Sequence, residues 1–373
     1  MIISGELLKR IRDADRKYEK TNVRDFSLPR YNPKTHYLKL TRSKYFNALV
    51  VLRHYTKIAS DYYFNVKEGA MCIDLFMLTP SISSPMGPGS DSKVIPVKFG
   101  RYTTNLVDSS QFGFEPLLLN GINKVYCYLP SMRGEKPDKR HLNQFFHCES
   151  EIKGTLEDII PVVEGYVRTL AETFLTMPCV LERISSDPKR SKEGLRNLLK
   201  TKHFPAVTFD VAVDLLINNG EKKLVHFTPF GRDITSGGEI ALAELLGFKT
   251  PFWIKYYDRD RVPFYQKPYP KNKEKTINAD LIFPALTKHS FGGEIVGCGQ
   301  RQDDSREMVD SLKRQKIDRT PYEWYINLRK LPAYRTTSGF GLGIERFIAW
   351  SLCRDDIKDG ILYPRLKNIK TYP

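Results

Sequence analysis

Apolar side chains recur along residues 41–66 at the three- and four-residue spacing of an amphipathic helix. An apolar run at residues 71–78 follows, and Pro80 ends it in the way that proline ends a strand. The pattern therefore predicts a long helix followed by a strand. Later segments repeat both patterns: helices are predicted over residues 156–175 and 207–218, and strands over residues 222–227, 251–257 and 278–283.

A second pattern alternates glycine with apolar residues in the last ninth of the sequence. Ser338–Arg346 reads S-G-F-G-L-G-I-E-R and continues into the apolar, helix-like run Phe347–Trp350. Glycine weakens a strand, so three glycines at every second position predict a backbone kept bare for a flat ligand. Arg346 would stand where strand passes into helix, and a guanidinium there can clamp a phosphate or stack on a base. The alternative is a nonspecific glycine turn, since the spacing is not that of a dinucleotide-binding G-x-G-x-x-G.

A third pattern is strand, polar loop, strand, beginning at residues 124–130. Cationic, acidic and aromatic side chains gather around the loop: Arg133, Glu135, Arg140, His141 and Phe145. These types suit an ATP site, because arginine binds the α-phosphate, a second cation binds the γ-phosphate, an acid accepts from the adenine amino group and an aromatic ring faces the base. A solvated charged hairpin with Phe145 in the core is the alternative.

Together these segments resemble motifs 2 and 3 of class II aminoacyl-tRNA synthetases, most closely those of the asparaginyl and aspartyl branch. Motif 2, F-R-x-E and then R-H-L-x-E-F, resembles Met132–Glu135 and Arg140–Phe145, and motif 3, G-F-G-L-G-x-E-R, is met in full by Gly339–Arg346. Four further segments match in order: Leu106–Glu115 (L-x-x-S-S-Q-L-Y-L-E), Gly231–Glu239 (G-x-D-L-x-x-E-x-E), Gly293–Asp304 (G-E-I-I-G-G-S-Q-R-E-D) and Tyr322–Arg329 (Y-x-W-Y-x-D-L-R).

The resemblance implies an α+β fold in which an antiparallel sheet is flanked by helices. It implies a catalytic domain over residues 41–373, with a helical insertion at about residues 153–220. The helix and strand ending at Pro80 would be motif 1, through which the family forms homodimers. Residues 1–40 are too few for the five-stranded OB-fold barrel that reads the anticodon in this branch, so we expect an N-terminal extension without that barrel.

The resemblance also assigns roles in an ATP-dependent reaction that forms an aminoacyl adenylate. Arg133, Arg346 and Glu294 would be catalytic, with Glu294 holding Mg²⁺ through carboxylate oxygens. The ATP site would comprise Arg133, Glu135, Arg140, His141, Phe145, Glu294, Gly341, Gly343 and Arg346. The protein would mainly position reactants and neutralise charge, without a covalent nucleophile.

The amino-acid site would comprise Ser109, Gln111, Glu115 and Arg329. Phe114 occupies the place of the lysine that helps aspartyl enzymes to read aspartate, and Glu115 matches the acid of asparaginyl enzymes. A buried carboxylate there favours asparagine over aspartate, although a salt bridge from Glu115 to a framework arginine is the structural alternative. Several departures from the family indicate an altered or enlarged pocket: Arg335–Ser338 for P-H-S-G, Asn327 for aspartate, Gly113 for a bulky residue, and Met86–Gly89 for an acidic segment in the Ser81–Ser92 loop, which we expect to be a lid.

Composition agrees with a cytoplasmic enzyme. No apolar run is long enough to cross a bilayer, the N-terminus is too polar for a signal peptide, and six scattered cysteines without a C-x-x-C pair indicate reduced, buried thiols. The formal net charge of +16 indicates an anionic partner or a basic face. tRNA, a phosphorylated small molecule and a lysine-rich genome are all compatible with that charge.

The sequence thus predicts a homodimeric ligase that activates asparagine, or a close analogue, with ATP and Mg²⁺. Without an anticodon barrel, tRNA binding would be weak, so a small-molecule acceptor is favoured. Three alternatives stay open: an asparaginyl-tRNA ligase that recognises only the acceptor stem, an asparagine synthetase using aspartate and ammonia, and a catalytically silent paralogue that binds RNA or protein. The intact Arg133, Glu135, Glu294 and Arg346 argue against the silent paralogue.

Overall fold

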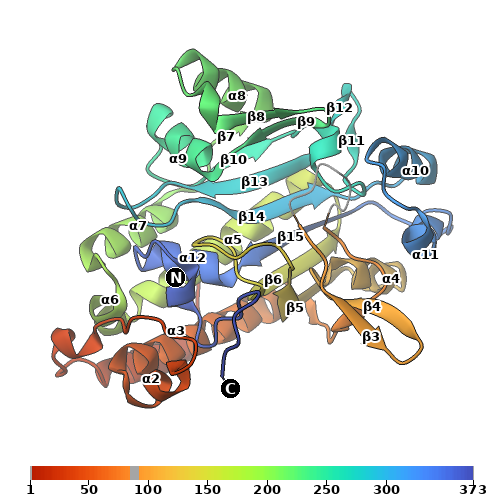
Figure 1. Ribbon diagram of the computed structural model, residues 1–373. Coiled ribbons are helices and arrows are strands. Elements are labelled where there is room, and N and C mark those ends of the chain that lie inside the picture. Colours follow the sequence, from red (N-terminus) through yellow and green to blue (C-terminus); the bar gives the residue numbers. More distant parts are fainter. Residues whose placement is uncertain (1, 85–91, 373) are drawn as a thin grey trace.

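The computed structural model describes residues 2–84 and 92–372 (Figure 1). Its strands are β1 Met71–Cys72, β2 Leu78–Thr79, β3 Pro96–Phe99, β4 Tyr102–Leu106, β5 Lys124–Met132, β6 Gln144–Lys153, β7 Ala206–Thr208, β8 Val225–Thr228, β9 Gly231–Ile234, β10 Phe252–Lys255, β11 Pro268–Tyr269, β12 Asn272–Thr276, β13 Asn278–Phe283, β14 Gly293–Gln300 and β15 Thr337–Gly343. Its α-helices are α1 Gly5–Arg16, α2 His36–Arg42, α3 Lys44–Asp61, α4 Glu115–Leu119, α5 Leu156–Leu175, α6 Pro178–Ile184, α7 Pro188–Lys200, α8 Phe209–Asn218, α9 Ser236–Leu245, α10 Ser305–Arg314, α11 Glu323–Leu328 and α12 Ile344–Ser351.

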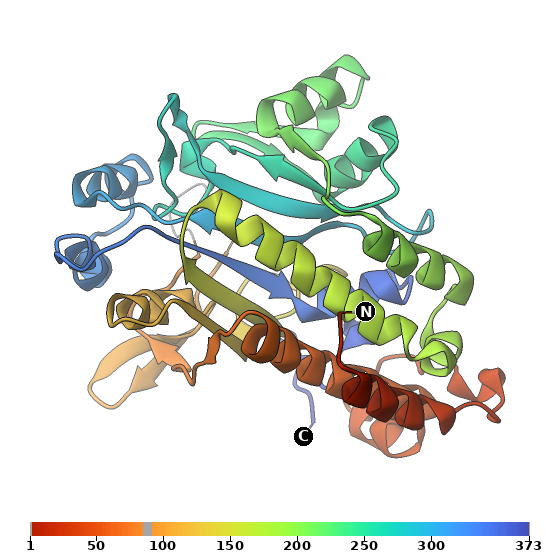
Figure 2. The ribbon, with the colours of Figure 1, turned by 180° about the vertical axis from the view of Figure 1, so that it is seen from behind.

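An eight-stranded sheet forms the centre of the fold, in the order β1-β5-β6-β15-β14-β13-β10-β7. Neighbouring strands from β5 to β10 are antiparallel, and the edge strands β1 and β7 run parallel to their neighbours. Helices α5 and α3 lie along one face of this sheet, as Figure 2 shows from behind. The predicted α+β class, with an antiparallel sheet flanked by helices, is confirmed.

The predicted helices and strands differ from the observed ones mainly at their ends. A break at Ser43 separates α2 from α3, and a π-helical segment, Tyr62–Lys67, continues α3. The strand predicted over residues 71–80 is present only as β1 and β2, because β1 pairs with β5 of the large sheet while β2 pairs with β4 of a small one. The chain leaves one sheet for the other, so the apolar run cannot stay a single strand.

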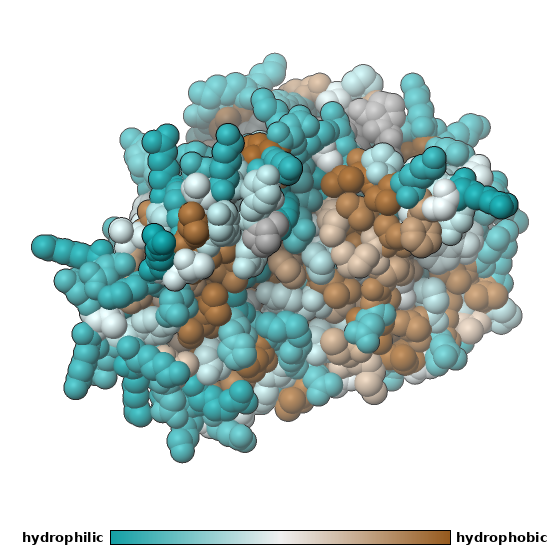
Figure 3. Space-filling model, turned by 60° about the horizontal axis from the view of Figure 1, so that its bottom comes forward, coloured by the Kyte–Doolittle hydropathy of each residue, from teal (hydrophilic) through white to brown (hydrophobic). Residues whose placement is uncertain are grey.

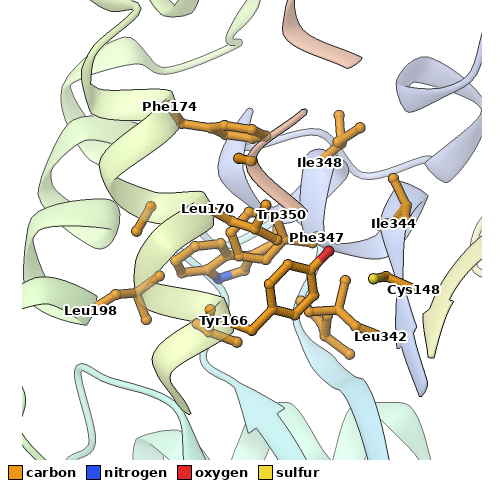
Figure 4. Close-up of a cluster of buried hydrophobic side chains, with 14 of the residues drawn as sticks. Cys148, Tyr166, Leu170, Phe174, Leu198, Leu342, Ile344, Phe347, Ile348 and Trp350 are labelled. Carbon is orange, nitrogen blue, oxygen red and sulfur yellow. The ribbon is translucent and has the colours of Figure 1, made fainter. Parts of the chain in front are cut away.

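The largest core lies between the sheet and the helices that cover it. Alternation along β15 turns Phe340 and Leu342 into this core, where Phe340 lies 6.3 Å from the Tyr166 ring of α5. Figure 4 shows side chains of α5, α7, β15 and α12 meeting there, including Phe347 and Trp350. Because Phe340 points into the core, Gly339 and Gly341 face the opposite side of the sheet.

The N-terminal segment is joined to this core by helix capping. The Asp15 carboxylate accepts hydrogen bonds from the backbone N–H groups of Cys179 (3.1 Å) and Val180 (2.8 Å) in the first turn of α6. Glu172 of α5 likewise accepts from the backbone of Ile2 and Ile3, each at 2.8 Å. Residues 2–40, as described, contain helices and no strand.

Two other expectations can be compared with the structure. No helix in the described ranges has the length and apolar character needed to cross a membrane. All six cysteines are free, but Cys72 is exposed and Cys179 half-buried, so the expectation of six buried thiols is wrong for these two. Cys72 lies on the short edge strand β1, which leaves its side chain open to solvent.

Candidate active site

Two adjoining cavities open on the sheet face opposite α5. The first has a volume of about 570 Å³ and is lined by Arg133, Glu135, Arg140, His141, Leu142, Phe145, His147, Glu294, Ile295, Gly341, Gly343, Glu345, Arg346 and Ile357. The second, of about 1260 Å³, is lined mainly by polar residues, among them Ser109, Gln111, Glu149, Gln266, Asp280 and Arg301. Arg133, His147, Glu294 and Gly341 line both, so they mark the junction between the cavities. All nine residues predicted for the ATP site line the first cavity.

The loop between β5 and β6 is shaped by Asp138. Its carboxylate accepts from the backbone N–H groups of Arg140 (2.7 Å) and His141 (2.8 Å) and lies 2.9 Å from Nδ1 of His141. Arg140 donates to the backbone carbonyl of Gly292 at 2.6 Å and stacks over Phe291. Burial and the neighbouring Arg346 lower the pKa of His141. The nearby Asp138 carboxylate acts in the opposite direction but does not outweigh them.

Arg133 extends from this loop towards the junction. Its guanidinium carbon is 5.3 Å from the Phe145 ring, and its Nε atom is buried with no hydrogen-bond partner within the described ranges. Glu135 accepts a hydrogen bond from the backbone N–H of Lys93 at 3.3 Å. Among the described residues, Arg133 therefore has a free N–H donor and lies next to an aromatic ring and an acid. This arrangement suits a ligand that carries a phosphate and a base.

Each glycine of β15 gives space to something different. A Cβ at Gly339 would lie 2.5 Å from Nη2 of Arg301 and 2.9 Å from Oε2 of Glu151, so this glycine makes room for a buried ion pair. At Gly341 the nearest atom, Oε1 of Glu149, is 3.5 Å away, and at Gly343 the side-chain stem of Arg346 begins at 3.3 Å. Gly339 thus makes room for protein side chains and also lines the second cavity, whereas Gly341 and Gly343 line the first.

Arg346 stands in the first turn of α12, as predicted, and is fixed by Glu294. Its Nη1 atom donates to the backbone oxygen (3.0 Å) and to Oε2 (2.9 Å) of Glu294. Burial raises the pKa of the Glu294 carboxyl, but Arg346, Arg133 and Arg140 outweigh it, and the net shift is downward. Glu294 is therefore a carboxylate at neutral pH.

Acidic groups also converge near Glu294. Carboxylate oxygens of Glu294 and Asp280 lie 3.5 and 3.6 Å from the position that a Cβ on Gly297 would take. Burial and the charges of Glu294 and Glu239 raise the pKa of Asp280 well above its usual value, and burial and Glu294 raise that of Glu239 to about 7. No group of three or more metal-ligating side chains is found in residues 2–84 and 92–372. Two converging carboxylates fit Mg²⁺, which binds through one or two carboxylates together with substrate phosphates.

The amino-acid residues predicted from the sequence divide into two pairs. Ser109 and Gln111 line the second cavity, where Ser109 is hydrogen-bonded to the buried carboxylate of Glu149. Glu115 and Arg329 lie outside the described linings of both cavities and form a buried ion pair, with Nη2 of Arg329 2.8 Å from Oε2 of Glu115. Arg329 lies over the rings of Tyr325 (3.8 Å) and Tyr334 (5.0 Å).

The departures from the family pattern have structural explanations in part. A Cβ on Gly113 would lie 2.7 Å from Leu75, so this glycine serves packing and does not enlarge the pocket as expected. Thr337 donates to Glu151 at 2.8 Å and supports its ion pair with Arg301. Met86–Gly89 and most of the Ser81–Ser92 loop lie outside the described residues.

Sequence reasoning missed several residues that line the second cavity: His147, Glu149, Gln266, Asp280 and Arg301. Arg301 belongs to the matched segment Gly293–Asp304, and Glu149 lies shortly after motif 2 on β6, so the sequence contains a signal for both. Gln266 lies in none of the matched segments. Only the fold brings its segment next to β14.

Comparisons with known proteins agree with this geometry. The family model of class II tRNA synthetases (D, K and N) matches residues 29–367. The asparagine–tRNA ligase of Pyrococcus furiosus is 33% identical over 263 residues, which cover 70% of this chain and 56% of that protein. That of Thermococcus gammatolerans is 31% identical over 285 residues, 76% of this chain and 61% of that protein. The chain thus spans about three fifths of the length of these curated relatives.

Solved structures extend the likeness to most of the chain. The crystal structure of asparaginyl-tRNA synthetase from Pyrococcus horikoshii, complexed with asparaginyl-adenylate, matches with a TM-score of 0.80 and 27% identity, covering 93% of this chain and 74% of that one. The cavities and motifs described above lie within the segment that the family model matches. The chain belongs to the class II tRNA synthetase family of the D, K and N type.

Proposed function

We propose that this protein activates asparagine with ATP as an aminoacyl adenylate and transfers the acyl group to tRNA. The observation that carries the proposal is the position of Arg133. This residue lines both cavities where they join, and its buried Nε–H group has no hydrogen-bond partner within the described ranges. A carboxylate oxygen of the amino acid in the second cavity attacks the α-phosphorus of ATP in the first, and pyrophosphate leaves. Arg133 would neutralise the charge that develops on the α-phosphate and orient the attacking carboxylate.

The other residues of the first cavity would hold the nucleotide. Phe145 and Arg346 would lie on the two faces of adenine, with Glu135 accepting from its amino group. Arg140 and His141 would bind the β- and γ-phosphates, and Gly341 and Gly343 leave room for base and ribose. Mg²⁺, held by Glu294 with Asp280, would supply positive charge to the phosphates.

The second cavity offers the charges that an amino acid needs. The acidic side chain of Glu149 lines it and suits an α-ammonium group, with Ser109 and Gln111 also in the lining. Behind this lining Glu115 would neutralise Arg329, so that no uncompensated positive charge attracts the carboxylate of aspartate in place of an amide. Asparagine is favoured because the curated relatives are asparagine–tRNA ligases.

The acceptor is the least constrained part of the proposal. The relatives support tRNA better than the small-molecule acceptor that the sequence favoured. The net charge of +16 is compatible with binding a nucleic acid backbone. A small-molecule acceptor would be the conclusion if asparagine were activated without any charging of tRNA.

We further propose that the protein is a homodimer. Exposed apolar side chains cluster along the chain segment of motif 1: Val66, Met71, Phe76 and Met77. Figure 3 shows apolar side chains gathered over part of the underside of the molecule. Such a patch is typical of an interface. Light scattering should give about twice the chain mass of 43.1 kDa, and a monomer at micromolar concentration that still turns over would contradict this.

Exchange of labelled pyrophosphate into ATP tests the proposed activation. With Mg²⁺ and asparagine the exchange should be fast, and without amino acid it should be absent. A charging assay with total tRNA then tests the acceptor, at low and physiological salt. Exchange that no amino acid supports would refute the proposed activity. Exchange with aspartate, with ammonia consumed to give asparagine, would instead identify an asparagine synthetase.

A further inference from the structure

The floor of the second cavity is made of two facing pairs of glycines. Gly297 pairs with Gly341, and Gly299 pairs with Gly339, on the antiparallel strands β14 and β15. The first pair includes Gly341 of the junction, and Asp280, Glu294 and Glu149 lie at ordinary contact distance from the Cβ positions of this pair. The second pair lies two residues farther along both strands, away from Glu294, a distance of about 6.6 Å. That displacement matches the reach of a short amino-acid side chain whose carboxylate lies at the junction.

Gln266 occupies the space above the second pair. Its side-chain amide lies against the position that a Cβ on Gly299 would take, so a side chain at position 299 would displace this amide. The Gln266 side chain lines the second cavity, yet the residue is only 8% exposed. Its amide oxygen is buried and makes no hydrogen bond within the described ranges. A buried amide with an unmet hydrogen-bonding group is costly unless a ligand satisfies it.

The backbone around Gln266 is fixed on both sides. Its own N–H donates to the Pro263 carbonyl at 2.9 Å, and the next residue donates to the Gln300 carbonyl at 2.9 Å. Gln266 also forms an isolated β-bridge with Arg301, which holds the segment against the end of β14. The backbone that carries the amide is therefore held in place beside β14, which limits where the side chain can reach.

We propose that Gln266 reads the substrate by hydrogen-bonding the polar end of its side chain, and that it selects a carboxamide over an apolar group of the same shape. A carboxamide both donates and accepts, so it can pair with the amide of Gln266 in either orientation. This inference rests on the proposed activation of an amino acid in the second cavity. It adds a residue that none of the matched motifs contains.

Gln266→Met tests the inference, because methionine has a similar length but cannot replace the hydrogen bond. Calorimetric titration should show the dissociation constant of asparagine rising by about 10- to 100-fold. Leucine, which has the shape of asparagine without its polar atoms, should bind the variant no worse than the wild type. In the exchange assay, KM for asparagine should rise while KM for ATP stays within about twofold.

Gln315→Met is the matched control. Gln315 is also buried and donates to the carbonyls of Arg259 and Val262, in the segment that leads to Gln266, but it lies outside the described cavity linings. It should lose stability without changing the preference for asparagine over leucine. An unchanged preference in Gln266→Met, or an equal change in Gln315→Met, would overturn the inference while wild-type exchange still supports the proposed function. A wild-type protein that neither binds nor activates asparagine would overturn both.

Discussion

The two cavities are built in different ways. The first takes most of its functional side chains from one hairpin, β5–β6, and one strand–helix junction, β15–α12, each continuous in sequence. The second takes many of its side chains from separate segments: one follows β4, one precedes β11 and one follows β14. A site built from continuous motifs can be recognised in the sequence, whereas a site assembled by the fold from distant segments cannot.

The cavities also differ in the charged residues that line them. The first is lined by three arginines, Arg133, Arg140 and Arg346, and suits phosphates. Three arginines, Arg133, Arg261 and Arg301, also line the second cavity. It differs in adding the acids Glu149, Asp233 and Asp280, of which Glu149 suits an ammonium group. Glu294, at the junction, faces both. A zwitterionic amino acid would thus be oriented with its carboxylate towards the arginines, where the reaction occurs.

The largest expected effect concerns the floor of the second cavity. Arg301 and Glu151, 4% and 0% exposed in their side chains, form an ion pair at 3.1 Å. Arg301→Met leaves the Glu151 carboxylate unpaired in the interior, so the free energy of unfolding should fall by about 3–5 kcal/mol. Chemical denaturation measures it. The double variant Arg301→Met with Glu151→Gln should recover much of the lost stability. An Arg301→Met variant as stable as the wild type would show that the ion pair does not stabilise this part of the cavity.

The next effect concerns the first cavity and is catalytic. Arg133→Ala and Arg346→Ala should each lower pyrophosphate exchange by about 10²–10³-fold, because each removes a positioned cation from developing phosphate charge. Lys139→Ala is the control: this lysine is in the same loop but is exposed and paired with Asp355. The Lys139→Ala variant should exchange pyrophosphate at nearly the wild-type rate. Equal losses in all three variants would point to a nonspecific effect of removing charge.

These residues show how much the sequence could predict. Arg133 and Arg346 were identified because each stands at a fixed place in a local motif, and a strand or hairpin carries such a motif intact into the fold. That Gly339 also makes room for Arg301 could not be predicted, since Arg301 comes from a different segment of the sequence. Gln266 could not be found, because its function depends on a β-bridge to Arg301 that no local pattern encodes. Spacing predicts local geometry, and long-range packing decides which side chain fills the space.

A smaller effect should follow from loosening the loop that carries Arg133. The Asn143 amide donates to the backbone carbonyls of Arg133 (2.7 Å) and Glu135 (2.8 Å), and the backbone N–H of Lys367 donates to its oxygen. Asn143→Ala should raise KM for ATP by about tenfold, because part of the roughly 2 kcal/mol of the two lost donor bonds would appear as weaker ATP binding. KM for asparagine should change less. Asn143→Asp keeps the acceptor for Lys367 but loses both donors, so it should resemble the alanine variant if the donors position the loop.

The last prediction concerns the effect of Glu115 on substrate preference, measured apart from the loss of stability that breaking a buried ion pair also causes. Its carboxylate neutralises Arg329 in a pair whose side chains are 1% and 0% exposed. Glu115→Gln keeps the shape of the side chain but leaves the arginine as an uncompensated cation behind the second cavity. A cation there attracts a substrate carboxylate, so the ratio of exchange rates with asparagine and aspartate should fall by about tenfold, or 1.4 kcal/mol. Gln266→Met should instead change the preference for asparagine over leucine, because it removes a hydrogen bond and no charge. Measuring all three amino acids with both variants separates the two contributions. If Glu115→Gln left the aspartate preference unchanged, the ion pair would be part of the framework only, and discrimination by charge would have to come from residues that line the cavity.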